Sequence, residues 1–504
     1  MTRTASPRTT VRAALPAVAP AALPAVLALA LGLWGIGRRD SMWRDESVTH
    51  QVAHRSLGDL GRLLGHIDAV HGLYYLLMHA VFALWDGGLL ALRLPSVLAT
   101  ALAAAGVGVI GARLAGRRAG VLAGTVFAVL PVTQQYAQEG RSYALVTAAV
   151  TWATYLFLRG LDAPGRRWWA GYAVLLALAC WLHEFAALAL TAYALTLWRL
   201  GAPRRTWRRW ALASAAVLAA LLLLAVLSAR QAEDQLGWLG RPSPALWFQY
   251  AAVAAVCALL ARWLLRNEPD EAGAPGTGDA ARGRVTLVWL GLGLAVLPAG
   301  LLMTVSLVKP WYVDRYVIYG MTGAALLAGA ALDRAVAGRA RWRRAVRVPV
   351  ACLAAVAAVA VLLPWSLAVR SPQSRKDDVV AVAREVRRLA RPGDGVLFLP
   401  ARRREWLLSR PGLYARLDDL ALAGSPAASA TLQGTELPAA EIRRRILAAD
   451  GIVALADPPG QPLDPYPQEA VKRDVLHRQF EVCARVHVHG AQILRYARPG
   501  RCAR

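Results

Sequence analysis

The chain has 504 residues, 57% of them hydrophobic, and a formal net charge of +26 at pH 7. A soluble globular chain is roughly 45–50% apolar, whereas here runs of about 20 apolar residues recur along most of the length, as in helices that cross a bilayer. The arginines lie in clusters between these runs, where membrane topology accounts for them. These features exclude a soluble protein and give no indication of a nucleic-acid partner, so we expect membrane lipid around most of the chain.

The first apolar run covers about residues 13–36 and follows a basic N-terminus. It is longer than the core of a typical secretory signal, and many more runs follow, so we expect an uncleaved first transmembrane helix. Arg3, Arg8 and Arg12 place the N-terminus in the cytoplasm by the positive-inside rule. The next stretch, residues 37–91, then forms a loop outside the cytoplasm.

Within this outer loop, the segment "VHGLYYLLMHAVFALW", residues 70–85, is apolar enough to suggest another span. If it crossed the membrane, every later basic loop would fall outside, against the positive-inside rule. The segment is also short for a span and contains His71 and His79. We therefore expect an interfacial or re-entrant helix over about residues 70–85.

The remaining apolar runs predict ten more spans, which leave the arginine-rich loops in the cytoplasm. Residues 168–182 and 185–199 could instead form one helix, because only His183 and Glu184 separate them, but the arginines favour two short helices joined by a turn that faces water. The odd number of spans places the tail outside. The ten spans are expected at about residues 92–112, 119–136, 143–159, 168–182, 185–199, 210–228, 244–265, 285–307, 316–334 and 347–367.

The tail differs in character from the rest of the chain. "KDDVVAVAREVRRLA" has apolar residues at helical spacing, "GVLFLP" and "GIVALADP" are typical of short strands, and "EVCARVHVHG" with "AQILRYAR" indicates a hairpin. The sequence thus predicts an all-α polytopic membrane bundle of about 11 transmembrane helices over residues 1–370, followed by a small extracytoplasmic α/β domain over residues 371–504. Cys483 and Cys502 lie in this domain, where they either form a disulfide or remain free thiols.

Nearly all the distinctive polar sequence falls in the predicted outer loops. A single active site on the outer membrane face would explain this concentration, whereas a transporter is expected to carry polar or interrupted helices near the membrane midplane. The four stretches are "WRDESVTH", "AQEGRSYA", "WLHE" and "VKPWYVDRY".

The order of these stretches resembles that in bacterial relatives of the protein O-mannosyltransferases, in the GT-C superfamily of membrane glycosyltransferases near glycosyltransferase family 39. The similar segments are "WRDES", "DAVHGLYYLLMHAVFALWDGGLLALRLPSVLA", "LPVTQQYAQEGRSYAL" and "VKPWYVDRY". The resemblance implies a multi-helix bundle, an acidic catalytic residue in the first outer loop and a polyprenyl-phosphate sugar as donor. In one departure, "VHGLYY" stands where the family often has "HPPLYY", which leaves the shape of that interfacial helix open, although His71 and Tyr74 keep their places.

By this resemblance, Asp45 is the expected general base, which would deprotonate the acceptor hydroxyl. Glu46 is expected to share the catalytic site, either by supporting Asp45 or by binding the acceptor. The pair could also ligate Mg²⁺ or Mn²⁺, but close relatives generally work without metal, so we expect no metal and no other cofactor. The alternative is that Asp45 or Glu46 only caps the helix that follows.

The donor phosphate is expected to meet Arg141, Arg315 and Lys309. An arginine can hold a phosphate through two parallel hydrogen bonds, although Arg141 could instead pair with Glu139, and cations beside aromatic residues also suit an ordinary aromatic belt. The residues expected to contact substrate are His71, Tyr74, Glu139, Tyr143 and Tyr316.

The leading hypothesis is an inverting, multi-pass plasma-membrane glycosyltransferase. It would move a sugar, with mannose as a candidate, from a polyprenyl-phosphate carrier to a protein, glycan or lipid acceptor outside the cytoplasm. The alternatives are a transporter or flippase for lipids or lipid-linked sugars, and a scaffold without activity that displays the tail.

Overall fold

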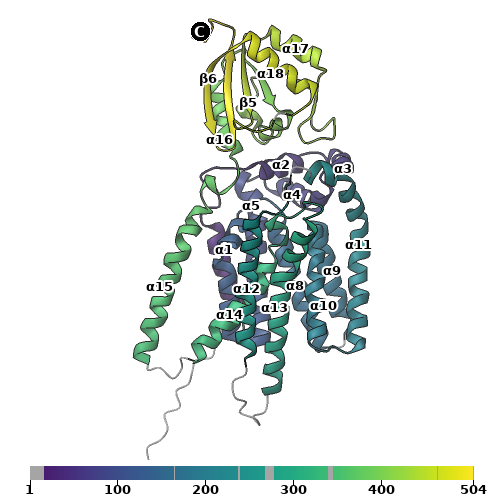
Figure 1. The fold of residues 1–504 in the computed structure, drawn as a ribbon, viewed down its shortest axis with the longest axis vertical. Helices are drawn as coiled ribbons and strands as arrows, with labels where there is room; N and C mark the ends of the chain where they lie inside the picture. The colour runs from purple at the N-terminus through teal and green to yellow at the C-terminus, as the bar shows by residue number, and fades with distance from the viewer. Residues whose placement is uncertain are drawn as a thin grey trace, which may run out of the picture.

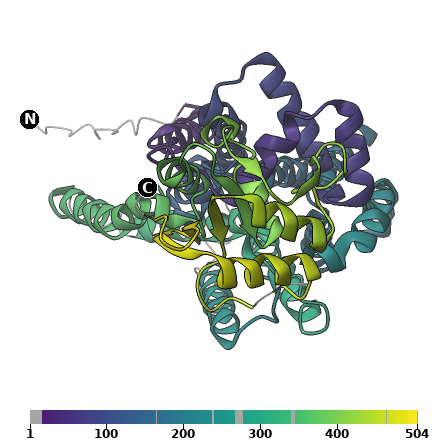
Figure 2. The ribbon, with the colours of Figure 1, turned by 90° about the horizontal axis from the view of Figure 1, so that it is seen from above.

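The computed structural model describes residues 16–163, 165–236, 239–266, 277–338, 344–462 and 464–502. It has a long helical bundle with a smaller part of strands and helices at one end (Figure 1). Seen from that end, the smaller part lies over the bundle, while one long helix, α15, extends to the side (Figure 2).

Long helices follow the eleven predicted spans, and the expected polytopic bundle is confirmed. Five of them, α5, α8, α11, α12 and α13, are long and apolar enough to cross a bilayer by length and composition. The helices are α1 (Ala19–Leu33), α5 (Gly88–Ala115), α6 (Arg117–Val129), α8 (Tyr143–Asp162), α9 (Arg166–Leu182), α10 (Ala189–Arg199), α11 (Arg204–Leu236), α12 (Pro244–Leu265), α13 (Thr277–Val305), α14 (Gly320–Gly338) and α15 (Arg344–Ala368).

Small residues let these helices approach closely. A Cβ placed on Gly323 of α14 would lie 2.3 Å from the carbonyl oxygen of Gly291 in α13, so the two backbones pack directly against each other. Association through small residues is typical of helices in lipid, where no hydrophobic effect drives them together. The prediction of two short helices at 168–182 and 185–199 is also confirmed, because α9 and α10 are separate and are joined by the 3₁₀ turn η2 (Glu184–Leu188).

Between the bundle and the strands lies a layer of short helices from the segment between α1 and α5 (Figure 1). The predicted helix over residues 70–85 is present as α4, which packs against α2, and the His79 ring nitrogen Nδ1 lies 2.9 Å from the carbonyl oxygen of Ala53 at the end of α2. The elements of this layer are α2 (Arg44–Ala53), α3 (Leu57–His66), η1 (Ala69–His71) and α4 (Gly72–Leu84). A further short helix, α7 (Pro131–Ala137), precedes α8.

The C-terminal part is a five-stranded mixed sheet in the order β2-β1-β5-β7-β6, with a separate β3–β4 pair. The predicted terminal hairpin is confirmed as the antiparallel pair β6–β7, and "VVAVAREVRRL" forms the predicted helix α16. The elements are α16 (Val379–Leu389), β1 (Gly395–Leu399), β2 (Asp418–Asp419), β3 (Leu422–Gly424), β4 (Thr435–Glu436), α17 (Ala439–Ala448), β5 (Gly451–Ala456), α18 (Pro467–Gln479), β6 (Glu481–Val488) and β7 (Ala491–Ala497). Short 3₁₀ turns lie at η3 (Asp314–Val317), η5 (Pro372–Ser374), η6 (Ala401–Trp406) and η7 (Pro411–Leu413).

Alternation along β1 gives the sheet two apolar faces. Val396 and Phe398 pack in the cluster that contains the valines of α16, whereas Leu397 packs with isoleucines of α17 on the other face. Successive side chains of a strand point to opposite sides, so helices cover both faces. Cys483 of β6 forms a disulfide with Cys502, which settles the open alternative between a bridge and free thiols.

Hydrogen bonds fasten the C-terminal part to α2. The backbone N–H of Arg44 donates to the Asp377 carboxylate at 2.7 Å, and the N–H of Val379 donates to the carbonyl of Met42 at 2.8 Å. The helix that carries Asp45 is therefore held between the bundle and the sheet.

Candidate functional site

A cavity of about 440 Å³ lies at the end of the bundle next to the C-terminal part. Residues from widely separated stretches of the chain meet in its walls. They are Arg44, Asp45, Val48, Ile67, Asp68, Val70, His71, Arg141, Tyr143, His183, Glu184, Phe185, Leu221, Ala225, Ser228, Ala229, Ala232, Trp311, Arg315, Tyr316 and Leu432.

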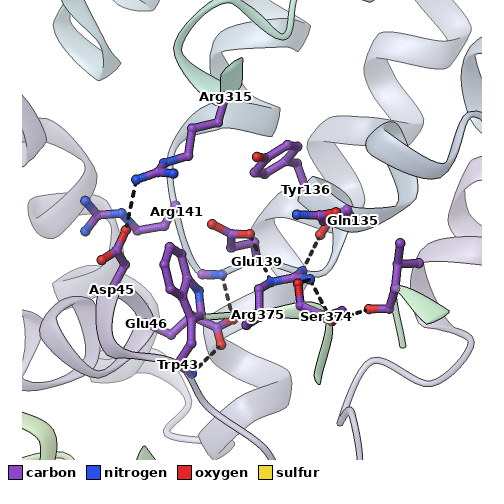
Figure 3. A network of polar contacts seen from close by, with 12 residues as sticks. Trp43, Asp45, Glu46, Gln135, Tyr136, Glu139, Arg141, Arg315, Ser374 and Arg375 are labelled. Carbon is purple, nitrogen blue, oxygen red and sulfur yellow. Dashed lines mark hydrogen bonds and ion pairs between the residues drawn. The ribbon is translucent and has the colours of Figure 1, made fainter. Parts of the chain in front are cut away.

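The start of α2 sends its two adjacent carboxylates in different directions. Glu46, three residues after the N-cap Trp43, accepts a 3.5 Å hydrogen bond from the Trp43 backbone N–H, which helps to fix where the helix begins. Because an α-helix has 3.6 residues per turn, consecutive side chains point about 100° apart around the helix axis. Asp45 consequently faces the cavity and Glu46 faces away from it (Figure 3).

Asp45 has one ion-pair contact in the cavity. Its Oδ2 lies 3.6 Å from Nη2 of Arg315, and the side chain stays 23% exposed. The carboxylate is also in the first turn of α2, where the helix dipole favours negative charge. This accessible carboxylate, close to a cation and open to a ligand, suits a general base.

Glu46 was expected to share the catalytic site, and the structure shows a different environment. Its carboxylate is fully buried and forms ion pairs of 2.7 Å with Arg38 and with Arg93 of α5, while the N–H of Gly140 donates to Oε1 at 3.0 Å. Burial alone would raise the pKa of Glu46, but the two guanidinium groups outweigh it and lower the pKa to about 2. The prediction of a catalytic Glu46 is therefore wrong in this structure, because the side chain anchors α2 and has no access to the cavity.

Arg141 lies in the cavity, as predicted. It follows α7, in the short connection that leads into α8, and its Nη2 donates to Nε2 of His71 at 2.6 Å. Burial, with the positive charge of Arg141, holds the pKa of His71 well below its usual range, so the imidazole is neutral and accepts this hydrogen bond. The Nε of Arg141 is buried with no hydrogen-bond partner among the described residues, which leaves donor capacity for a ligand.

Glu139 does not pair with Arg141 or reach the cavity, in contrast to both alternatives considered. Its Oε2 lies 3.3 Å from Nε of Arg375, which comes from the connection between α15 and α16 (Figure 3). Arg375 also donates to the carbonyl of Gln135 at 2.8 Å. Glu139 thus fastens the C-terminal part to the bundle, and its predicted substrate contact is wrong in this structure.

Arg315 lies in the cavity beside aromatic rings, as predicted from "KPWYVDRY". Its guanidinium donates to the Tyr143 hydroxyl at 3.1 Å and lies 5.6 Å from the centre of the Tyr316 ring. Tyr143 and Tyr316, both expected to contact substrate, line the cavity. Lys309, by contrast, is exposed and does not line the cavity.

His71 lines the cavity as expected, whereas Tyr74 does not. Tyr74 is completely buried in the main apolar cluster. Its neighbour Tyr75 instead donates through its hydroxyl to the carboxylate of Asp68, a cavity residue. The predicted Tyr74 contact is therefore wrong. Consecutive residues of α4 point in different directions, so Tyr75 reaches Asp68 whereas Tyr74 packs in the apolar cluster.

The sequence interpretation missed several polar residues of the cavity. His183 and Glu184 were expected to form a turn in water, but both line the cavity, and Glu184 accepts from the hydroxyl of Ser228 in α11. Burial, together with Arg141 and Arg315, lowers the pKa of His183 to about 3. The signal that could have found them was the "HE" pair itself, two titratable residues at the junction of two apolar helices.

One wall of the cavity is apolar. Leu221, Ala225, Ala229 and Ala232 contribute from α11, with Phe185 and Trp311 from other elements. The polar lining residues come from α2, η1 and the start of α8. The residues that α11 contributes to the lining include three alanines, whose small side chains leave space in the cavity. Such a pairing of cations with an apolar channel suits an amphiphilic ligand.

Among the described residues, the group of three potential ligands that could hold an ion is His50, His54 and Asp86, none of which lines the cavity. Asp45 and Glu46, which were weighed as a possible Mg²⁺ or Mn²⁺ pair, do not converge on one point in this arrangement, so the two cannot ligate one ion here.

Comparisons with known proteins agree with this architecture. A family model described as dolichyl-phosphate-mannose-protein mannosyltransferase matches residues 73–230. The chain is similar to ArnT from Cupriavidus metallidurans bound to undecaprenyl phosphate, with 13% identity, a TM-score of 0.62 and coverage of 95% of this chain and 98% of that one. For the apo state of the same protein, the identity is 13%, the TM-score 0.58 and the coverage 94% and 97%.

A weaker likeness, with a TM-score of 0.45 and 10% identity, exists to the oligosaccharyltransferase of Archaeoglobus fulgidus in its apo form, covering 87% of this chain and 69% of that chain. No curated protein sequence matches the chain. The family match and the ArnT likeness together confirm the expected resemblance to GT-C membrane glycosyltransferases and the GT-C fold.

Proposed function

We propose that the protein is an inverting glycosyltransferase that takes a sugar from a polyprenyl-phosphate carrier. The observation that carries the proposal is the cavity itself, where an accessible carboxylate, two arginines and an apolar wall converge. The match to the mannosyltransferase family model supports the reaction class. Undecaprenyl phosphate, which ArnT binds in a structure of the same fold, supports the donor class. These findings give no support to a transporter.

The phosphate of the donor binds between Arg141 and Arg315. Both side chains project into the cavity, and each has a neutral ring group, His71 or Tyr143, as its hydrogen-bond partner. Neither ring partner carries a negative charge, and the carboxylate beside Arg315, that of Asp45, lies 3.6 Å away, so both guanidinium groups can engage an anion. In a site shielded from water, such fixed cations stabilise the charge that develops on the leaving phosphate.

Asp45 takes the proton from the acceptor hydroxyl. The hydroxyl oxygen then attacks the anomeric carbon of the sugar, on the face opposite the phosphate, while the bond from that carbon to the phosphate oxygen breaks. The polyprenyl phosphate leaves with both bonding electrons, and the configuration at the anomeric carbon is inverted. The 3.6 Å separation of Asp45 and Arg315 supports this arrangement, because it places the base next to the phosphate site.

The prenyl chain follows the wall formed by α11. Leu221, Ala225 and Ala229 lie about one turn apart on this helix and line the cavity. Other leucines of α11, including Leu218 and Leu222, are exposed on the helix surface, where lipid would surround them. An isoprenoid can thus extend from the phosphate site towards the bilayer.

The cavity faces the outside of the cytoplasmic membrane, and the acceptor arrives there. The arginine clusters predicted to face the cytoplasm support this orientation through the positive-inside rule, at residues 113–118, 159–167, 199–209, 262–284 and 334–347. Mannose is the first sugar to test because of the family description. Protein, glycan and lipid acceptors are each tested separately in the assay.

Incubation of the purified protein with radiolabelled polyprenyl-phosphate sugars tests the proposal. We expect label to move from at least one donor to a membrane or envelope acceptor, with release of polyprenyl phosphate. Release without transfer would indicate hydrolysis, and a lack of any reaction across donors and acceptors would contradict the proposed activity.

A further inference from the structure

A second group of chemically active side chains lies on the same short helix as Asp45 but outside the cavity. His50 and His54 stand four residues apart at the C-terminal end of α2, and Asp86 comes from the connection between α4 and α5. One ligand atom from each lies within 4.8 Å of the others. None of the three lines the cavity, so the proposed transfer reaction gives them no task.

The hydrogen bonds of His54 determine which ring nitrogen is available. Nδ1 lies 2.7 Å from the backbone carbonyl of His50, and a carbonyl only accepts, so Nδ1 carries a hydrogen. Nε2 lies 3.3 Å from Oδ2 of Asp86, which is also an acceptor. A neutral ring would therefore direct a lone pair at a carboxylate oxygen. The contact needs either a second proton on Nε2 or a cation between the two atoms.

The distances and the ring positions favour a metal ion. In a tetrahedral site with bonds of about 2.0–2.1 Å, neighbouring ligand atoms are about 3.3 Å apart, which is the separation of Nε2 and Oδ2 here. The ring of Phe82 stacks on that of His54 with their centres 4.5 Å apart and lies 5.4 Å from His50, so α4 restrains both imidazoles. The N–H bond from the opposite nitrogen to a carbonyl is the support that metal-binding histidines usually have.

We propose that His50, His54 and Asp86 bind a divalent transition-metal ion of the zinc class. Two imidazoles and one carboxylate are a ligand set that zinc accepts, with water in the fourth position because Asp86 and His54 are partly exposed. The ion would join the end of α2 to the α4–α5 connection. It is a structural clamp on the helix that carries Asp45, and it takes no part in the chemistry of the cavity.

The test is metal binding by the full-length protein, purified in detergent without a polyhistidine tag and freed of metal with EDTA. Zn²⁺ is titrated by calorimetry, and Co²⁺ is titrated in parallel to observe the absorption of a tetrahedral cobalt site. We expect one ion per chain in the wild-type protein. His54→Ala and Asp86→Asn should each weaken binding at least about tenfold, because the loss of an outer-shell partner alone costs about 10- to 100-fold and each of these residues supplies a ligand.

His66→Ala is the matched control. The His66 ring makes the same kind of hydrogen bond, from Nδ1 to the carbonyl four residues earlier at 2.8 Å, but it belongs to no potential metal group among the described residues. This variant should bind zinc like the wild type. Equal binding by wild type, His54→Ala and Asp86→Asn, or no binding by the wild type, would overturn the proposal and leave a protonated His54 paired with Asp86.

Discussion

Asp45 and Glu46 are neighbours in the chain but meet opposite electrostatic conditions. Glu46 is enclosed by Arg38 and Arg93, which compensate its burial, whereas Asp45 pairs at 3.6 Å with Arg315, a residue that a phosphate would engage. In the proposed reaction, donor binding draws Arg315 towards the phosphate. The carboxylate of Asp45 is then free to accept a proton.

Arg141 and Arg315 should therefore be needed for donor binding. Arg141→Ala and Arg315→Ala each remove a charge-assisted contact, worth about 1.5–3 kcal/mol, and should weaken the binding of a polyprenyl-phosphate sugar by about 10- to 100-fold. Equilibrium binding of a fluorescent donor analogue to purified protein measures this change.

Lys309→Ala is the control for the two arginine variants. Lys309 is close to Arg315 in the chain and also cationic, but it is exposed and lies outside the cavity. Its removal should leave the Kd of the donor unchanged. A loss as large as that of Arg315→Ala would mean that general surface charge, rather than the cavity, attracts the donor.

The sequence alone identified those cavity residues that lie within short local motifs. It failed where the direction of a side chain depends on a partner that is distant in the chain. The stretches "WRDES", "QEGRSY" and "VDRY" led to Asp45, Arg141 and Arg315. Nothing local could show that Glu46 turns towards Arg93, which lies 47 residues further along. Glu139 was misassigned for the same reason, since its partner Arg375 comes from the connection between α15 and α16, far along the chain.

At the scale of elements, α2 is held at its buried face. The carboxylate of Glu46 links α2 to α5 through an ion pair with Arg93. It also links α2 to the segment between α1 and α2 through an ion pair with Arg38. Glu46→Gln would leave two buried guanidinium groups without their counter-charge. Breaking a buried pair in this way costs about 3–5 kcal/mol, so we expect a clear fall in the apparent Tm of the protein in detergent.

Glu385→Gln is the matched comparison for this variant. Glu385 also makes a 2.7 Å ion pair, with Arg388 on α16, but the pair lies at the surface, where such pairs contribute about 0–1 kcal/mol. Its Tm should change little. If the Glu46→Gln protein had the same Tm as the Glu385→Gln protein and lost only its activity, Glu46 would be a catalytic group after all.

The elements themselves were largely predictable because hydropathy is a local property. Long apolar runs predicted α5, α11 and α13, and alternating residues before and after a glycine predicted the β6–β7 hairpin. The inward direction of the His183–Glu184 turn was not predictable. A polar pair between two apolar helices can face water or a cavity, and only the packing of α11 against η2 decides between them.

At the scale of the whole molecule, the orientation in the membrane is a separate prediction. Gly61→Cys in α3 and Gly412→Cys in the C-terminal part should react with a maleimide that cannot cross the membrane when it is added to intact cells. Arg205→Cys, at the start of α11, should react only after the membrane is opened. Added Cβ atoms at Gly61 and Gly412 meet nothing within 4 Å, so the first two substitutions should be tolerated.

Labelling above that of the parent chain, followed by mass spectrometry, distinguishes the two orientations. Reaction of Arg205→Cys in intact cells, with protection of the other two positions, would place the cavity in the cytoplasm. The proposed acceptors outside the cytoplasm would then be wrong, whereas the donor class would be unaffected.

The central claim is that Asp45 is the base of a sugar transfer from a polyprenyl-phosphate donor. Its most direct test compares the initial transfer rate of the Asp45→Asn protein with that of Asp59→Asn, using a donor that the wild type accepts. The Asp45 and Asp59 side chains are equally exposed, at 23%, and each pairs with an arginine, but Asp59 lies outside the cavity. We predict that Asp45→Asn lowers the rate by about 10²-fold or more, with an unchanged Tm and retained donor binding, and that Asp59→Asn transfers sugar like the wild type. A near-native rate for Asp45→Asn would contradict the account.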